Sequence, residues 1–289
     1  AIERAQQLVS KIGSIEDQFF VMWGLWGWRI IRADMDICSG IADEIMQLVE
    51  NSPEGQELLA EAHWVIGATA YYKGDFRTGL KLLEKGVELV DAENEIVHSL
   101  KTGQRCSRMC RSHVALALWQ LGFPDQALRQ ADETVRLARE QGHAFTLALV
   151  LFFRRQVLEF CGCRDQALAS IEEVYNICHE NGFVFFEVHA IFGRGDALLR
   201  QGKIDEAREQ FGLGLEMLTA TGGNLSMDHP YRNIAESFLA AGLLADARQW
   251  LDRGFNLVNH HHERGMESEF LRLQGEAALA AGDQERAEG

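Results

Sequence analysis

Apolar and polar positions recur along this chain at an interval of 40 residues. Within each interval the apolar residues follow helical spacing, and no stretch alternates with the period of two that is typical of a strand. A turn segment that starts with glycine and ends with alanine marks the interval five times, beginning at Gly122, Gly162, Gly202, Gly242 and Gly282. The pattern predicts an array of one supersecondary unit, a helical hairpin, repeated along the chain.

The hairpins are expected to be irregular over 1–103 and regular over 104–289. The regular first helices are expected at about 105–121, 144–161, 184–201, 226–241 and 266–281. The second helices are expected at about 124–140, 164–180, 204–220 and 244–259, and left-handed caps are expected at Gly142, Gly182 and Gly222. Upstream helices are expected at about 19–32, 37–49, 57–73 and 76–90, after an amphipathic piece that ends near Gly13. Because Gly74 and Gly122 are 48 residues apart, the extra residues are expected to extend a helix through 95–98.

A small residue, an apolar residue, a glycine, an alanine and a bulky apolar residue follow one another at fixed spacing in each repeat. The clearest copy is Gly195, Leu198, Gly202, Ala207 and Phe211. This pattern resembles the tetratricopeptide (TPR) repeat. The resemblance implies an all-α, right-handed TPR-like superhelical solenoid of about seven helical hairpins. The sequence departs from the TPR pattern in three ways. Its period is 40 residues, whereas TPR repeats have about 34, and no proline stands at the repeat ends. Arg155 occupies a small-residue position, and this long side chain puts the packing of its repeat in doubt.

Two segments, 142–148 and 267–276, look like the C-terminal TPR-type region of large bacterial signalling ATPases and cyclase-associated regulators. The likeness implies a sensor or scaffold arm whose parent chain holds the catalytic machinery. A solenoid needs a polar capping element at each end. Since the last repeat stops at Gly289, just where its second helix should begin, we expect a single TPR-like domain over 1–289, excised from a longer chain.

The charge and the apolar content of the chain argue against two classes of partner, nucleic acids and membranes. The 28 Lys and Arg against 43 Asp and Glu give a net charge of −15, which repels phosphate backbones and argues against nucleic acid. No apolar run approaches the ~20 residues that span a bilayer, so no membrane partner is expected. The six cysteines match neither zinc nor C-x-x-C redox spacing, and we interpret them as buried, reduced thiols in a cytoplasmic protein.

Motifs for catalysis or cofactor binding are not found. No phosphate-binding glycine loop, nucleophile elbow or H-E-x-x-H occurs, so we expect no enzyme, no catalytic residue and no cofactor. The run His260 to His262 is the most tempting metal feature. Adjacent helical positions point ~100° apart and cannot converge on one ion, so a solvated linker or a favourable charge at a helix C-terminus is expected, and no metal site.

Function is expected on the concave surface, which the first helices of a TPR-like array line. The predicted ligand-binding residues are aromatic at the N-terminal rungs and charged at the C-terminal ones. They are Trp64, Tyr71, Tyr72, Ser112, Trp119, Phe152, Gln156, His189, Phe192, Asp196, Arg200, His229, Arg232 and Glu236. Exposed aromatic residues beside a few polar groups suit a protein or peptide partner, which can be another domain of the parent chain. The alternative is that these aromatic residues pack rung on rung, and that His189 and His229 are partly exposed and make only local hydrogen bonds.

Other hypotheses remain open at this stage. A small-molecule sensor would hold a sugar or metabolite near Phe152, His189, Phe192, His229 and Arg232. A self-association module, such as a homodimer, would pair through the cluster of Trp23, Trp26 and Trp28. The i+3 series Arg105, Arg108 and Arg111 either receives a carboxylate or phosphate or forms a solvated helix face.

Overall fold

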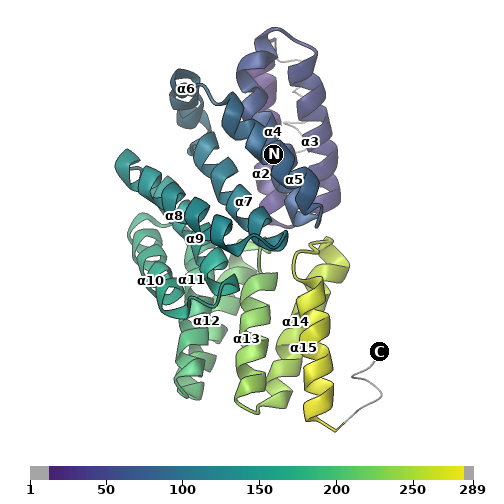
Figure 1. The fold of residues 1–289 in the computed structure, drawn as a ribbon, viewed down its shortest axis with the longest axis vertical. Helices are drawn as coiled ribbons and strands as arrows, with labels where there is room; N and C mark the ends of the chain where they lie inside the picture. Colours follow the sequence, from purple (N-terminus) through teal and green to yellow (C-terminus); the bar gives the residue numbers. More distant parts are fainter. Residues whose placement is uncertain (1–12, 283–289) are drawn as a thin grey trace. The chain divides into compact units, whose positions relative to one another are not determined.

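The computed structural model describes residues 13–282, and every regular element within them is helical (Figure 1). Fourteen α-helices and one short 3-10 helix occupy this range, which contains no strand. The prediction of an all-α chain is therefore confirmed. The amphipathic piece expected before Gly13 and the expected interruption of the last hairpin at Gly289 lie outside the described residues.

The helices group into two compact units, the first ending at Ser170 and the second beginning at Ile171, within α10 (Arg164–Asn181). The first unit contains α2 (Ile15–Ile31), α3 (Met35–Glu50), the 3-10 helix η1 (Glu54–Leu58), α4 (Leu59–Tyr72), α5 (Phe76–Leu89), α6 (Ala92–Thr102), α7 (Cys106–Gln120), α8 (Pro124–Gln141) and α9 (Ala144–Phe160). The second contains α11 (Val184–Arg200), α12 (Ile204–Thr221), α13 (Asp228–Ala240), α14 (Leu244–His261) and α15 (Glu267–Ala280). The single domain and the right-handed superhelical course stay predictions.

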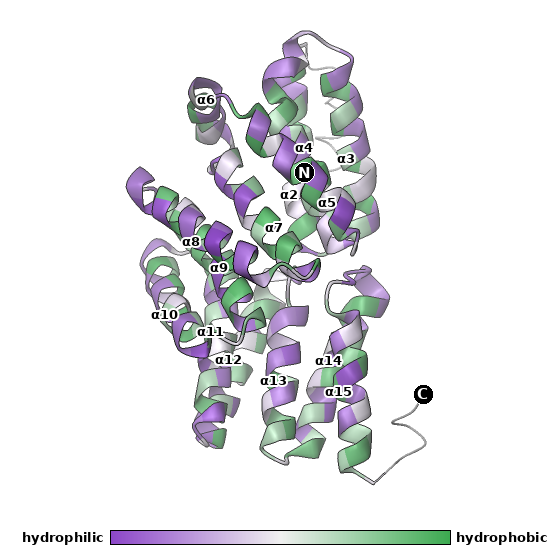
Figure 2. Ribbon diagram, viewed as in Figure 1, coloured by the Kyte–Doolittle hydropathy of each residue, from purple (hydrophilic) through white to green (hydrophobic). Residues whose placement is uncertain are grey.

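Helix boundaries follow the sequence pattern closely. From α7 onward each helix begins and ends within two residues of its expected position. The largest difference is at α2, which begins at Ile15, ahead of the expected 19–32. Ser14 explains it, because its Oγ accepts a hydrogen bond from the N–H of Asp17 at 3.1 Å and so caps the helix earlier. Figure 2 shows hydrophobic and hydrophilic residues interleaved along the helices, as amphipathic packing requires.

Second helices end in the left-handed conformation that the glycine register predicts. Gly142, Gly182 and Gly222 have φ angles of 73°, 72° and 65°. The next position in this register is His262, which adopts φ 56° at the end of α14. Glycine reaches this conformation without the steric penalty that a Cβ brings. His262 is therefore a strained version of the same cap.

The substitution His262→Gly is expected to raise the free energy of unfolding by about 0.5–1 kcal/mol, because it removes the Cβ penalty of the left-handed cap. The converse change at the matched position, Gly222→Ala, is expected to lower it by about 1 kcal/mol. Urea denaturation of the two variants checks both signs. A loss of stability in His262→Gly would show that the imidazole contributes more than its backbone strain costs.

Small and bulky residues interlock between the two helices of a hairpin, as the TPR resemblance implies. A Cβ built on Gly195 of α11 would lie 2.5 Å from the Phe211 ring of α12. A Cβ on Gly67 of α4 would lie 2.7 Å from Cγ of Leu83 on α5. Separations this short are overlaps, so only glycine lets these helices approach so closely. The bulky partner fills the space that the glycine leaves.

Arg155 occupies a small-residue position, where the sequence put packing in doubt. The structure buries its side chain and pairs Nη1 with both carboxylate oxygens of Glu159, one turn along α9, at 2.8 and 3.0 Å. The guanidinium also lies 5.4 Å from the centroid of the Phe152 ring. The repeat therefore accommodates the long side chain by neutralising its charge inside the packing layer.

Helix α6 is the insertion behind the 48-residue interval, and it confirms the helix expected through 95–98. Its polar side chains anchor it to the first unit. Nδ1 of His98 lies 2.8 Å from Oε1 of Glu61 on α4, and Oε1 of Glu95 accepts the N–H of Ser107 at 2.7 Å. Lys101 pairs with Glu16 of α2 at 2.6 Å.

No helix of the described range is long and apolar enough to cross a membrane. All six cysteines carry free thiols; four of them are buried, as expected, but Cys161 and Cys163 are only partly buried, so the expectation of burial is wrong for these two. Burial raises the pKa of Cys38 and of Cys178 to about 12, so both remain thiols.

Candidate binding faces on the first helices

Five of the six aromatic residues predicted to line a groove are core residues. Trp64, Tyr71, Tyr72, Phe152 and Phe192 are all at most 6% exposed. The expectation of an exposed aromatic lining is therefore wrong for these five, and the packing alternative holds. The physical reason is that a first helix in a tightly stacked array contacts helices on three sides, so a periodic aromatic residue finds apolar neighbours before it finds solvent.

Rings from successive helices form the contacts that bury them. The Trp64 ring lies 5.0 Å from Trp26 of α2 and 6.3 Å from His113 of α7, centroid to centroid. Trp26 also donates its indole N–H to Oγ1 of Thr69 at 2.9 Å. Trp26 is thus part of the core, which removes the central member of the tryptophan cluster proposed for self-association.

One predicted aromatic position remains partly exposed. Trp119 near the end of α7 stacks on Phe160 of α9, with ring centroids 4.1 Å apart and an interplanar angle of 13°. The two rings lie on neighbouring first helices. Trp119 is therefore the one aromatic residue of the predicted set that solvent partly reaches.

Ser112 and Gln156 are buried on α7 and α9. Among the described residues, neither Oγ of Ser112 nor Nε2 of Gln156 has a protein hydrogen-bond partner. A buried polar atom left in this way costs about 1–3 kcal/mol. Both positions therefore favour a polar atom of a water or ligand, which keeps their assignment as ligand-binding residues a prediction.

His189 and His229 are also buried, at 1% and 4% exposure. The ring of His189 lies 5.1 Å from that of Phe185 on the same helix. The expectation of two partly exposed histidines is wrong, because both side chains point into packed layers. Their 40-residue separation therefore marks equivalent buried positions on α11 and α13.

The charged residues of the prediction come together in the second unit. Asp196 and Arg200 of α11 and Arg232 and Glu236 of α13 form one network with three residues of α15. The full set, called here the charge ladder, is Asp196, Arg200, Arg232, Glu236, Glu269, Arg272 and Glu276.

Each arginine of the charge ladder contacts more than one carboxylate. Arg200 Nε lies 2.9 Å from Asp196, and its Nη2 lies 3.9 Å from Glu236 on the next first helix. Arg232 bridges in the same way, with Glu236 at 3.5 Å and Glu269 of α15 at 3.3 Å. Signs therefore alternate from α11 through α13 to α15.

The α15 end of the charge ladder is bound most tightly. Arg272 lies 3.6 Å from Glu236, 2.9 Å from Glu269 and 2.5 Å from Glu276. Burial alone would raise the pKa of Glu269, but the hydrogen bond from Arg272 and the charges of Arg272 and Arg232 lower it. Hydrogen bonding to Glu269 raises the pKa of Arg272 in turn. The side chains of the charge ladder are 15–51% exposed.

Sequence reasoning missed a pair of buried carboxyl groups in the second unit. Glu263, in the connection between α14 and α15, accepts the N–H of Ser226 at 2.9 Å through Oε1. Asp228, the first residue of α13, accepts the N–H of His229 at 2.8 Å. Burial raises the pKa of both groups, and the charge of Asp228 adds to the increase at Glu263. No spacing marks them, because they meet only through the fold.

The substitution Glu263→Gln is expected to stabilise the protein more at about pH 8 than at about pH 5. The raised pKa means that the folded state holds a proton that the unfolded state releases, so the free energy of unfolding falls as pH rises above about 4.5. The amide keeps the Ser226 contact without the charge, and the expected gain at about pH 8 is roughly 1–3 kcal/mol. Urea denaturation at several pH values measures it.

The exposed Glu209→Gln on α12 is the matched control and should change the free energy of unfolding by less than about 0.5 kcal/mol at every pH. An unchanged pH dependence in Glu263→Gln would contradict the assignment of a buried, protonated carboxyl.

The run His260 to His262 ends α14 and begins the loop that follows it. Among the described residues, no group of three or more His, Cys, Asp or Glu side chains is placed to hold a metal ion.

Known protein structures resemble this fold, but the sequence matches no protein family. No protein-family model matches the chain, and no curated protein matches it. Among solved structures, a Rap protein complexed with the competence and sporulation factor superposes with a TM-score of 0.63 at 14% identity, over 98% of this chain and 80% of that one. The Rap conjugation gene regulator of plasmid pLS20, in complex with the Phr* peptide, gives a TM-score of 0.67 at 14% identity, over 96% and 76%.

A third similar structure is a signal transduction ATPase with numerous domains and a tetratricopeptide repeat sensor, from Pyrococcus horikoshii. It gives a TM-score of 0.52 at 16% identity, over 98% of this chain and 43% of that chain. The fold is a TPR-like repeat array. This confirms the resemblance drawn from the small and bulky positions around Gly195 and Phe211. The TPR-like array departs from the commonest repeat in its longer helices and in the inserted α6.

Proposed function

We propose that this TPR-like array is a non-catalytic regulatory module that binds a peptide segment of a partner protein along the face of its first helices. The observation that carries the proposal is the charge ladder, which spans three successive first helices with side chains that solvent reaches. The proposed setting is a bacterial, cytoplasmic signalling protein, with other domains of the parent chain supplying any catalysis.

An extended peptide suits the charge ladder better than a compact ligand does. The ladder runs from α11 across α13 to α15, and a chain that rises about 3.3 Å per residue can follow such a row. Both signs are available, so a peptide with basic and acidic side chains can exchange ion pairs with the carboxylates and arginines in order. Exchange of partially exposed pairs contributes specificity more than affinity.

The similar structures support this choice of ligand class. One of them was solved with the Phr* peptide and another with the competence and sporulation factor, and a third carries its TPR repeats as a sensor in a signal transduction ATPase. They share this fold at only 14–16% sequence identity, so the identity of the ligand must be inferred from the residues of this chain.

A small-molecule sensor is the second candidate, and Ser112 and Gln156 favour it. Their buried polar atoms lack protein partners among the described residues, as an enclosed ligand with hydrogen-bonding groups requires. That site would lie in the first unit and share no residue with the charge ladder, so variants distinguish the two functions.

The test is fluorescence anisotropy with a library of labelled decapeptides, alongside a thermal-shift screen with sugars and metabolites. The variants are Arg272→Gln in the charge ladder and Arg208→Gln on α12, whose side chain pairs with Asp246 at 3.0 Å outside the ladder. The expected result is a peptide whose affinity falls about tenfold in Arg272→Gln and stays unchanged in Arg208→Gln.

A stabilising metabolite whose effect is lost in Gln156→Ala, with no peptide bound, would overturn the proposal in favour of the sensor. Equal losses in both arginine variants would show that the charge ladder is not the site.

A further inference from the structure

Helix α6 directs polar residues inward and apolar residues outward, the reverse of an ordinary surface helix. Glu95 and His98 are buried against the first unit, whereas Ile96 and Val97 are half exposed and Leu100 is 84% exposed. Single exposed apolar residues need no explanation. Three on one helix of eleven residues form a patch of the kind that marks an interaction surface.

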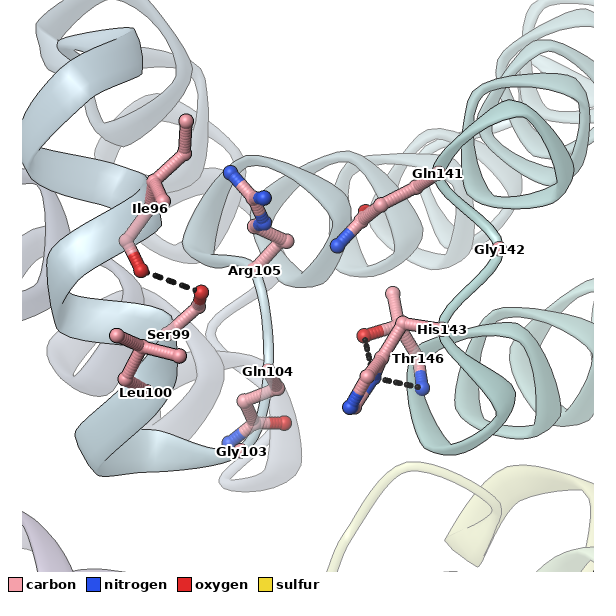
Figure 3. A pocket seen from close by; sticks show the side chains of 10 residues that line it. All are labelled: Ile96, Ser99, Leu100, Gly103, Gln104, Arg105, Gln141, Gly142, His143 and Thr146. Carbon is pink, nitrogen blue, oxygen red and sulfur yellow. Dashed lines mark hydrogen bonds between the residues drawn. The ribbon is translucent and has the colours of Figure 1, made fainter.

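A cavity of about 290 Å³ opens beside this patch (Figure 3). Ile96 and Leu100 line one wall, and Arg105 lies at the start of α7. Gln141, the last residue of α8, and Thr146, in the first turn of α9, line the facing wall. In Figure 3 the Gln141 side chain points across the cavity toward Arg105. One recess therefore has apolar and cationic walls.

The arginines at this cavity, Arg105 and the neighbouring Arg108, do not have hydrogen-bond partners for all of their N–H groups within the described part of the chain. Arg105 lies 3.7 Å from Glu95, a long ion pair, and its buried Nε has no hydrogen-bond partner among the described residues. Arg108, one turn further, donates from Nη1 to Oγ of Ser107 at 2.6 Å, and its buried Nε likewise has no partner in that range. Burial lowers the pKa of Arg108, and the charges of Arg105 and Arg111 lower it further. A carboxylate in the cavity would pair with Arg105, which lines it and whose ion pair with Glu95 is long.

Charge decides which class of partner fits. The chain carries a net charge of −15, so a nucleic acid or an anionic membrane would be repelled by most of the molecule. A short acidic peptide places few charges near the molecule, so screening leaves mainly the local interaction with Arg105. Its apolar side chains would cover the exposed residues of α6.

We propose that the outer face of α6 and this cavity form a second binding site, which takes an acidic peptide segment of a partner protein. A leucine- or phenylalanine-type side chain packs against Ile96 and Leu100, and an adjacent carboxylate binds Arg105, with Gln141 completing its hydrogen bonds. The site lies in the first unit and uses no residue of the charge ladder.

The test uses fluorescein-labelled octapeptides with several glutamates around one leucine or phenylalanine, and a matched panel with lysine in place of glutamate. Anisotropy titrations compare the native chain with Leu100→Ser and Arg105→Gln. The controls are Leu271→Ser on α15, which removes a leucine that is 55% exposed, and Arg136→Gln on α8, an exposed arginine. Leu100→Ser alters a side chain with almost no burial, so it is expected to keep the native melting temperature.

The expected result is that the tightest glutamate peptide binds about tenfold more weakly to both site variants and equally well to both controls. Three results would overturn the inference: no glutamate peptide binding below about 1 mM, equal binding of the lysine panel, or binding that survives Leu100→Ser. A concentration-dependent mass that Leu100→Ser abolishes, without peptide binding, would assign the α6 face to a second copy of the chain and also overturn it.

Discussion

Phe192→Ala is expected to lower the free energy of unfolding by about 3–5 kcal/mol. The Phe192 side chain has no exposed surface, and its ring lies 5.9 Å from that of Tyr231 and 6.0 Å from that of Trp250, centroid to centroid. It also fills the space over Gly214, where a Cβ would lie 3.0 Å from the ring. Truncation leaves a cavity that these rings and the backbone cannot close. Urea denaturation of the variant measures the loss.

The matched control is Leu213→Ala on α12, next to Gly214 but 45% exposed, with an expected change below about 0.5 kcal/mol. The comparison tests whether Phe192 is a core residue or a groove residue. A loss below about 1 kcal/mol for Phe192→Ala would mean that the ring faces a site and not the packed layer.

His98→Leu is expected to lower the free energy of unfolding by about 3–5 kcal/mol, because it leaves the buried carboxylate of Glu61 without its partner. The hydrogen bond to Glu61 raises the pKa of His98 above its ordinary 6.5. The contribution of the pair is therefore complete below about pH 6.5 and is lost as pH rises through the higher folded-state pKa. The difference between the native chain and the variant should shrink accordingly in alkaline solution.

The double variant Glu61→Met with His98→Leu removes both charges, so it distinguishes the contribution of the ion pair from the cost of leaving one buried charge unpaired. Replacing both charges by apolar groups of similar volume is expected to recover most of the lost stability, since a buried pair contributes little beyond compensating its own desolvation. A double variant as unstable as the single one would show that His98 acts through its ring contact with Phe20, at 5.6 Å, and not through Glu61.

The fold could be predicted from the sequence because its rules are local and repeated. Gly142, Gly182 and Gly222 fix helix ends through their own backbone conformation, and Gly195 with Phe211 fixes helix approach through volume. Such features act within one hairpin and recur every 40 residues, so the helix boundaries predicted for one repeat support those predicted for the others. The insertion α6 could be predicted for the same reason, because the 48 residues from Gly74 to Gly122 exceed the 40-residue interval.

The candidate site was only partly predictable. Periodicity placed Asp196 and Glu236 on equivalent positions of successive first helices, and the structure joins them through Arg200. The same periodicity could not separate exposed from buried aromatic residues, because Trp64 and Phe192 repeat with the packing layer. The Asp228 and Glu263 pair and the outward face of α6 depend on contacts between distant segments, which no spacing records.

The most direct test of the proposed function is to locate a bound peptide on the arginine side chains. NMR spectra of the Nε–H groups can be recorded while the tightest decapeptide from the library is titrated to saturation. The account predicts that the signals of Arg200, Arg232 and Arg272 shift together with one affinity, while that of Arg208 stays unchanged. Shifts confined to arginines outside the charge ladder, with those three unmoved at saturation, would contradict it.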